Sequence, residues 1–355
     1  MKVILGCMEF GRYANEAESA EMSTAFLKAG HYEMDTAHMY VNGTSETFLG
    51  RMKNKDQVSR VAVTCQMHVA TKANPWNGKG LGKKSVVEQL TTSLQRLGVD
   101  SVDLFYLHAP DHSTEIAETL EAVNELYKAG KFKRFGLSNY AAWYVHSTAQ
   151  SGREVAEIFY LCKSNSWVLP TVYQGMYNAI TREVEVELFS ALARFKIAFY
   201  AYNPLAGGLL TGTEHYRTDI AGKYVYEDRD DKKPTGRFFG NDWADIYQKR
   251  YWKKVNFECI DKLRGTQHDI TITAALDEIY GKGKVTPTQA SFRWMLHHSQ
   301  MSAARGDGII IGASKLGHVE QNLTACAAGP LDARVVAIFD ECWHHNKADC
   351  PRYFR

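Results

Sequence analysis

Four polar residues with complementary chemistry, Asp35, Tyr40, Lys72 and His108, end or follow apolar stretches of the chain. These stretches are YEMDTAHMY (32–40), VAVTCQMHVATK (61–72) and VDLFYLH (102–108). If they are strands of an α/β barrel, their carboxyl ends meet at the rim where catalytic groups collect. A carboxylate, a phenol, an amine and an imidazole at one rim predict proton transfer to a carbonyl group.

Tyr40 is the candidate general acid of this quartet. A free phenol titrates near pH ~10, and a nearby Lys72 ammonium would lower the pKa of Tyr40 by stabilising the phenolate. Asp35 would keep Lys72 charged and oriented, and His108 would hydrogen-bond the carbonyl oxygen. Structural interpretations compete with these roles: a core tyrosine, an Asp35–Lys72 ion pair inside a barrel, or a core histidine.

The elements that must position the quartet follow from an alternation of strand and helix patterns. Strands are predicted at 3–8, 31–38, 61–69, 102–108, 133–139, 171–178, 196–208 and 308–314. Helices are predicted at 16–30, 45–52, 83–98, 113–131, 141–152, 184–195, 246–264, 270–281, 286–299 and 315–329, and 330–355 is predicted to be partly helical. Repeated βα units predict a parallel sheet, and eight of them predict a (β/α)₈ TIM barrel.

An open doubly wound sheet is the alternative fold. It predicts a G-x-G-x-x-G turn after an early strand, and the sequence contains none. The polar stretch 211–245 is too long for an ordinary connection, which predicts a functional loop or lid. We expect residues 1–355 to form a single domain.

The composition limits the class of protein. A net charge of +2 gives no reason to expect binding to nucleic acid or to an anionic membrane. The seven cysteines form no C-x-x-C pair, which favours reduced thiols. There is neither a signal-peptide core nor an apolar run near the ~20 residues of a membrane span. We therefore expect a cytoplasmic protein.

Long motifs in a fixed order carry a family resemblance. They are LGCMEFGR (5–12), DTAHMY (35–40), TKANPWNGK (71–79), VDLFYLHAPDHST (102–114), GLSNY (136–140), LPTVYQGMYNA (169–179), FYAYNPLAGGLLTG (199–212), GRFFGNDWADIYQKRYW (236–252), RWMLHHSQ (293–300) and the terminal YFR. In these motifs the chain resembles the aldo-keto reductases, and within them the aflatoxin-aldehyde (succinic semialdehyde) reductase subfamily. The resemblance implies a (β/α)₈ barrel that binds NADPH without a Rossmann motif, and a homodimer.

The resemblance also implies roles for individual residues. Asp35, Tyr40, Lys72 and His108 match the catalytic tetrad, with Tyr40 as proton donor. The residues that match cofactor contacts are Ser138, Asn139 and Gln174 for the nicotinamide carboxamide, Tyr202 for stacking on its ring, Asn203, Leu205, Gly207 and Gly208 for the pyrophosphate, Arg237 beside them, and Gly312, Ser314, Lys315, Gln321 and Asn322 for the adenosine and its 2′-phosphate. Besides Tyr40 and His108, the residues that match substrate contacts are Tyr247, Arg250 and Arg355. The two arginines favour aldehydes with a carboxylate, such as succinic semialdehyde or 2-carboxybenzaldehyde, or dicarbonyls.

Other functions remain open from the sequence. A cofactor-binding redox sensor or channel-type subunit would keep the cofactor and turn over little. A Schiff-base lyase needs Lys72 with a depressed pKa, whereas Asp35 would keep it protonated. A metal enzyme is disfavoured because the His297-His298 and His344-His345 pairs do not present two ligands on one helix face.

Three features depart from the family pattern. Residues 213–222 look like an additional loop. His38 stands where relatives tend to carry an aromatic or apolar residue, which predicts an altered substrate preference. His318 stands where many relatives carry an arginine, which bears on the preference for NADPH over NADH.

Overall fold

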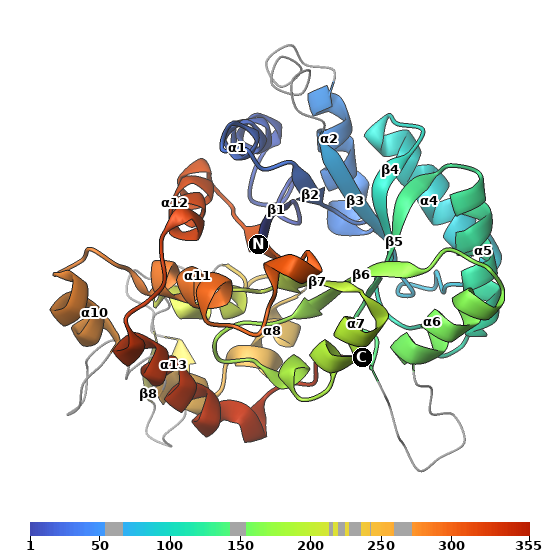
Figure 1. Ribbon diagram of the computed structural model, residues 1–355. Helices are drawn as coiled ribbons and strands as arrows, with labels where there is room; N and C mark the ends of the chain where they lie inside the picture. The colour runs from blue at the N-terminus through green and yellow to red at the C-terminus, as the bar shows by residue number, and fades with distance from the viewer. Residues whose placement is uncertain are drawn as a thin grey trace.

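Eight parallel strands close into a barrel in the order β1-β10-β7-β6-β5-β4-β3-β2 (Figure 1). The computed structural model describes residues 1–53, 67–142, 154–212, 216–218, 224–226, 236–241, 243–258 and 272–355. The barrel strands are β1 (Lys2–Gly6), β2 (Glu33–Asp35), β3 (His68–Ala73), β4 (Val102–Leu107), β5 (Phe132–Ser138), β6 (Pro170–Met176), β7 (Ala198–Tyr202) and β10 (Gly308–Gly312). Because β1 pairs with both β2 and β10, the sheet has no free edge, and the predicted TIM barrel is confirmed.

Helices surround the barrel on the outside (Figure 1). Their bounds are α1 (Glu16–Lys28), α2 (Thr44–Lys53), α4 (Lys83–Leu97), α5 (Ile116–Lys128), α6 (Glu154–Ser164), α7 (Leu188–Phe195), α8 (Ala244–Tyr251), α10 (Ile272–Tyr280), α11 (Pro287–His297), α12 (Leu316–Ala327) and α13 (Ala333–Asn346). Within the described ranges, none of these helices is long and apolar enough to cross a membrane.

Local sequence signals explain where several helices begin. Asn15 caps α1 and forms a reciprocal capping box with Glu18. Thr286 and Gln289 do the same for α11, whose first residue is Pro287, as its position in the sequence predicts. These caps satisfy backbone N–H groups that the first helical turn leaves without partners.

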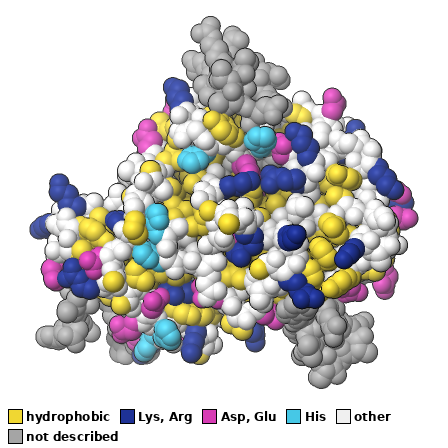
Figure 2. Space-filling view, in the orientation of Figure 1, with side chains coloured by type: hydrophobic (Ala, Val, Ile, Leu, Met, Phe, Trp, Pro, Cys, Tyr) yellow, Lys and Arg dark blue, Asp and Glu magenta, His cyan; other side chains and the backbone are white. Residues whose placement is uncertain are grey.

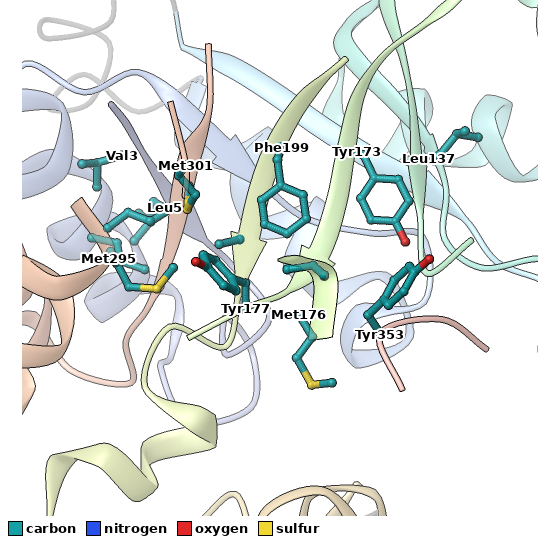
Figure 3. Packing of buried hydrophobic residues seen from close by; sticks show 14 of the residues in the cluster. Val3, Leu5, Leu137, Tyr173, Met176, Tyr177, Phe199, Met295, Met301 and Tyr353 are labelled. Carbon is teal, nitrogen blue, oxygen red and sulfur yellow. The ribbon is translucent and has the colours of Figure 1, made fainter. Parts of the chain in front are cut away.

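Two layers of apolar side chains hold the barrel together. Inside it lies a small cluster of Ile4, Ala70, Leu104, Tyr106, Val172, Tyr200 and Ile310. A larger cluster fills the space between strands and helices, where Phe199 of β7 packs near Tyr177 and Tyr173 (Figure 3). The interior is therefore a packed core, and a ligand can enter only at an end of the barrel.

A polar network closes the N-terminal mouth of the barrel. Glu33 of β2 accepts hydrogen bonds from Lys2 of β1 at 2.5 Å, Arg134 of β5 at 3.2 Å and the Tyr200 hydroxyl of β7 at 2.7 Å. On the face that Figure 2 shows, Lys and Arg side chains gather over the middle, where the barrel lies. Four strands are thus tied together at the end opposite the predicted site.

The observed elements differ from the predicted ones in a few places. β3 begins at His68, and the residues 61–66 assigned to it lie outside the described ranges, as does most of the predicted helix 141–152. The sequence does signal the unpredicted α6, since Val155, Ile158 and Cys162 have helical spacing and are buried.

Among its described residues, the predicted polar loop 211–245 contains a short antiparallel pair, β8 (Tyr216–Thr218) with β9 (Tyr224–Tyr226), and α8 starts at Ala244. The helix predicted at 246–264 is interrupted after Tyr251. Trp252 leaves the helical conformation and packs edge-on against Phe239 and Phe257 at 4.9 and 4.8 Å, so tertiary packing overrides the local pattern.

Candidate active site

The predicted quartet comes together at the C-terminal rim of the barrel. Asp35 is the last residue of β2, Lys72 lies next to the end of β3, and His108 follows β4. The Lys72 ammonium donates to Asp35 Oδ1 at 2.6 Å, to the backbone oxygen of Thr36 at 2.6 Å and to the Tyr40 hydroxyl at 3.5 Å. Each N–H of the ammonium group therefore has one acceptor, which fixes its position beneath Tyr40.

The imidazole of His108 lies on the other side of Tyr40. The two rings meet edge to face with centroids 5.7 Å apart. The Nδ1 atom of His108 is buried and has no hydrogen-bond partner among the described residues. Burial lowers the pKa of His108 well below its usual range, and the positive charges of Lys72 and Arg355 add to this shift. The imidazole is therefore neutral at physiological pH and can donate one N–H.

Burial controls the protonation of the other three groups. It raises the pKa of Asp35 and lowers that of Lys72, while their contact at 2.6 Å opposes both shifts. Burial also raises the pKa of Tyr40 well above its usual range, and the charge of Asp35 adds to the increase. The expectation that the pKa of Tyr40 is lowered beside Lys72 is thus wrong, because desolvation dominates. Tyr40 is held as a neutral phenol.

The turn that carries Tyr40 is strained. Val41 has φ 49° and ψ 45°, and Asn42 has φ 52° and ψ 33°, so both are left-handed, and Gly43 follows with φ 91°. A non-glycine residue in such a conformation costs about 1–3 kcal/mol and persists only where its surroundings hold it. The residues packed around this turn must therefore hold it in this conformation, and with it the side chain of Tyr40.

A cavity of about 570 Å³ opens above the quartet, within the ~300–1,000 Å³ common for ligand sites. Most of the predicted site residues line it: Asp35, Tyr40, His108, Ser138, Asn139, Gln174, Tyr202, Asn203, Leu205, Gly207, Gly208, Arg237, Tyr247, Arg250, Gly312, Ser314, Gln321, Asn322 and Arg355. Two do not. Lys72 is fully buried beneath the floor, and the exposed Lys315 precedes the first turn of α12.

Side-chain hydrogen bonds already engage the residues expected at the nicotinamide. Gln174 Nε2 donates to Asp35 Oδ2 at 2.7 Å. Asn139 Nδ2 donates to the backbone oxygen of His108 at 2.8 Å and to Ser138 Oγ at 3.0 Å, and Asn139 Oδ1 accepts from the Tyr202 hydroxyl at 2.7 Å. These bonds connect β2, β5, β6 and β7 and hold the floor of the cavity in one arrangement.

Backbone after β7 is suited to bind an anion. Gly207 has φ 73° and packs so closely against the Tyr247 ring that an added Cβ would lie 2.8 Å from it. Gly208 has φ 108° and open space where a side chain would stand. Left-handed glycines next to a cavity let a ligand approach the backbone closely.

A segment from further along the chain covers this part of the cavity. Arg237 forms an ion pair with the buried Glu9, and its guanidinium lies 5.0 Å from the Tyr247 ring centroid. Glu9 also accepts two hydrogen bonds from Arg12, at 2.7 and 2.8 Å. Glu9 lies shortly after β1, whereas Arg237 lies after β9. The ion pair therefore joins two segments of the cavity lining that are far apart in the sequence.

Two arginines from distant parts of the chain line the cavity. Arg250 comes from α8, and Arg355 ends a segment that passes beside α7 (Figure 1). The Arg355 guanidinium lies 5.0 Å from the Trp76 ring centroid, and Trp76 in turn meets His108 edge to face at 5.0 Å. Burial lowers the pKa of Arg355, and the nearby charge of Arg250 contributes to this shift. An anion bound here would relieve the repulsion between the two guanidinium groups.

The sequence did not identify Glu9 and Trp76 as residues of the cavity, and it predicted for His38 an effect on substrate preference that its position in the structure does not support. Glu9 directly follows the strand predicted at 3–8, so the same rule that selects strand ends would have found it. Trp76 lies in a connection whose approach to His108 depends on tertiary structure. His38 was expected to act on substrate preference, but it lies outside the cavity and contacts Ser93 and Arg96 of α4 at 3.4 Å each.

The barrel and its rim define a class of protein, an α/β-barrel enzyme of carbonyl chemistry. A model of the Aldo/keto reductase family matches residues 2–344. The chain is 51% identical over 352 residues to aflatoxin B1 aldehyde reductase member 2 of Homo sapiens, covering 99% of this chain and 89% of that protein. It is 50% identical over 355 residues to aflatoxin B1 aldehyde reductase member 4 of Homo sapiens, and 49% identical over 356 residues to aldo-keto reductase family 7 member A3 of Homo sapiens. Each of these two alignments covers 99% of this chain and 96% of the relative.

The chain therefore belongs to the aldo/keto reductase family. It is an oxidoreductase of a family that uses a nicotinamide cofactor. The resemblance seen in its motifs, including that to the aflatoxin-aldehyde reductases, is confirmed.

Proposed function

We propose that this protein reduces aldehydes to alcohols with NADPH and favours aldehydes that carry a carboxylate. The observation that carries the proposal is the Lys72 ammonium held between Asp35 and the Tyr40 hydroxyl under a cavity that also contains His108. We also infer that residues 1–355 form one domain, because the barrel strands run from Lys2 to Gly312 and the family match extends to residue 344.

Several residues would hold the cofactor. The backbone of Gly207 and Gly208 and the side chain of Arg237 suit a pyrophosphate. Gly312, Ser314, His318, Gln321 and Asn322 line the end of the cavity beside α12 and suit an adenosine with its 2′-phosphate. Near the quartet, Ser138 Oγ and the Gln174 side-chain oxygen can accept hydrogen bonds from a carboxamide. Bound NADPH would supply the hydride that reduces the carbonyl carbon.

Tyr40 would supply the proton. Hydride addition leaves an alkoxide, which is a much stronger base than a phenolate, so a neutral phenol suffices as the acid. As the proton leaves, negative charge develops on the Tyr40 oxygen, and the Lys72 ammonium at 3.5 Å stabilises it. Asp35 and the Thr36 backbone oxygen keep that ammonium in place. The neutral His108 would donate its free N–H to the carbonyl oxygen and orient it toward Tyr40.

The two arginines support a carboxylate on the substrate. Arg250 and Arg355 both line the cavity, and burial together with the charge of Arg250 lowers the pKa of Arg355, so the two guanidinium groups repel each other. A guanidinium pairs with a carboxylate through two parallel hydrogen bonds. The Trp76 ring between Arg355 and His108 would limit the distance between carboxylate and aldehyde.

The proposal is tested by NADPH oxidation with matched pairs of aldehydes. We expect succinic semialdehyde over butanal, and 2-carboxybenzaldehyde over benzaldehyde, to show kcat/KM higher by about 10–100-fold, mainly through KM, because a charge-assisted hydrogen bond contributes about 1.5–3 kcal/mol. Arg355→Met and Arg250→Met should each reduce this ratio. Arg334→Met, whose side chain lies on the surface with 61% exposure, is the control.

Two results would contradict the proposal. Equal kcat/KM for the charged and neutral members of each pair would remove the carboxylate preference. Absence of NADPH oxidation with every aldehyde, in protein that binds NADPH, would favour a cofactor-binding sensor over an enzyme that reduces aldehydes.

A further inference from the structure

A single arginine contacts the strained turn of Tyr40 on both sides. Arg96, in the last turn of α4, donates from Nη1 to the backbone oxygen of His38 at 2.8 Å. Its guanidinium also lies against Gly43, where an added Cβ would stand 2.2 Å from Arg96 Cζ. The group therefore touches the chain two residues before Tyr40 and three residues after it.

A buried carboxylate orients this guanidinium. Glu46, in the first turn of α2, has no exposed surface and pairs with Arg96 Nη1 through Oε2 at 3.1 Å. Its other oxygen, Oε1, accepts from the Thr71 hydroxyl at 2.6 Å. Thr71 precedes Lys72 on β3. The pair thus connects the turn of Tyr40 to the strand that carries Lys72.

The conformation of the turn needs such support. Val41 and Asn42 are left-handed without being glycine, and Val41 is β-branched, which makes this conformation especially unfavourable. Local preference would return both residues to φ below zero and move the Tyr40 hydroxyl away from Lys72. Arg96 opposes this movement because relaxation of the turn would break its contacts with His38 and Gly43.

We propose that Arg96 and Glu46 are positioning residues that hold the Tyr40 hydroxyl beside Lys72 for proton transfer. Neither residue lines the cavity, so neither touches the substrate, and Arg96 acts through the turn. Glu46 orients Arg96, and its charge also helps to keep Lys72 protonated. The inference rests on the proposed role of Tyr40 as proton donor. An ion pair that serves stability alone would not have to contact both sides of the catalytic turn.

The first experiment replaces the guanidinium and keeps the length of the stem. In Arg96→Met we expect kcat per folded enzyme to fall by about 100-fold, the size expected for a displacement near 1 Å. NADPH affinity, measured by tryptophan quenching, should stay within about twofold, because Arg96 does not reach the cavity. The solvent deuterium isotope effect on kcat should rise, since proton transfer becomes slower.

The matched control lies on the same helix. Lys83→Met removes the exposed ion pairs with Glu121 and Glu125 at the start of α4 and should change neither kcat nor the isotope effect. Should Arg96→Met fold poorly, Glu46→Gln serves in its place. It keeps an acceptor for Thr71 and loses the charge that orients Arg96, so we expect a smaller decrease in kcat with the same rise in the isotope effect.

A rescue separates positioning from stability. Glycine adopts left-handed conformations without strain, so Val41→Gly should let the turn keep its shape without the arginine. We expect Arg96→Met/Val41→Gly to regain about tenfold in kcat over Arg96→Met. A stabilising substitution elsewhere would raise the melting temperature and leave kcat low.

The outcomes distinguish this inference from the function on which it rests. If Tyr40→Phe is inactive while Arg96→Met and Glu46→Gln keep full kcat and a normal isotope effect, the positioning role is wrong and the acid role stands. A fall in melting temperature with unchanged kcat per folded enzyme would also overturn it. If Tyr40→Phe retains full activity, the acid role fails and the positioning role fails with it.

Discussion

At the scale of single residues, burial of the quartet keeps Tyr40 protonated and ready to act as the acid. Burial and the charge of Asp35 raise the pKa of Tyr40, so the phenol keeps its proton. The Lys72 ammonium becomes important only when charge develops on the phenol oxygen, at 3.5 Å. Such a site favours the transition state over the ground state, which is what accelerates a reaction.

Tyr40→Phe tests this argument directly. Loss of the hydroxyl removes the proton donor, and general acid catalysis typically contributes about 10²–10⁴-fold, so we expect kcat to fall by that factor. The affinity for NADPH should change little, as the ring remains. Tyr160→Phe, at a tyrosine with 51% exposure on α6, is the control. Steady-state kinetics and a cofactor titration measure both effects, and unchanged turnover would exclude Tyr40 as the acid.

At the scale of elements, the segment after α13 reaches the cavity with Arg355 and is anchored by the buried Tyr353. The Tyr353 hydroxyl donates to Glu187 Oε1 at 2.5 Å and accepts from the Ala142 backbone N–H at 2.9 Å. In Figure 3 its ring stands beside Tyr173, with the two hydroxyl groups pointing toward one another. Two residues further, the Arg355 N–H donates to the Asn139 backbone oxygen at 3.0 Å. The bonds of Tyr353 and the backbone bond of Arg355 to Asn139 together hold this segment, and with it the Arg355 side chain, against the barrel.

Tyr353→Phe should weaken carboxylate recognition selectively. Without the hydroxyl, the segment loses its bonds to Glu187 and Ala142, and Arg355 becomes less ordered. We expect KM for succinic semialdehyde to rise by about tenfold, because a less ordered Arg355 binds the carboxylate more weakly by about the free energy of one hydrogen bond, ~1 kcal/mol or slightly more. The kinetics with butanal should be nearly unchanged. Tyr127→Phe, at an exposed position on α5, is the control, and an equal loss with both aldehydes would count against this role.

At the scale of the whole molecule, the two ends of the barrel have different tasks. The C-terminal rim carries the cavity, while the N-terminal mouth is closed by Glu33 with Lys2, Arg134 and Tyr200. Burial alone would raise the pKa of Glu33, but its hydrogen bond with Lys2 and the charge of Arg134 outweigh burial and lower it. Changes at the mouth should therefore affect stability and leave the chemistry unaltered.

Glu33→Gln should lower the free energy of unfolding by about 1–3 kcal/mol, since it uncouples two cations from a partly buried carboxylate. Because the pKa of Glu33 is lower in the folded protein than its ordinary value of 4.5, its ionised form stabilises the fold above pH 4.5. This contribution is lost as the pH falls below 4.5, so the difference between variant and parent should shrink there. Urea unfolding of both proteins at pH 7 and pH 4 measures this difference in the free energy of unfolding.

The control for this prediction is Glu121→Gln, which removes an exposed ion pair with Lys83 and should cost less than ~1 kcal/mol. We expect kcat and KM to remain unchanged in both variants. A loss of activity in folded Glu33→Gln would show that the two ends of the barrel are coupled.

The sequence by itself determined the barrel and most of its rim. Alternating strands and helices predict a parallel sheet, and residues that end parallel strands must meet at one edge, so Asp35, Lys72 and His108 could be grouped without a structure. Membership of the family follows from motifs that extend over nearly the whole chain. Caps such as that of α11 are equally local, since a few neighbouring residues define them.

Only the tertiary structure decided the protonation of Tyr40 and the contacts that hold its turn. The pKa of the phenol depends on burial by the whole rim, which no local pattern encodes. Arg96 reaches His38 and Glu46 across 58 and 50 residues of sequence, and nothing in the pattern of α4 marks it. His38 was expected to affect substrate preference because it stands where relatives tend to carry an aromatic or apolar residue, but its side chain contacts Ser93 and Arg96 of α4. Packing between elements sets these contacts, so they appear only when the barrel has closed.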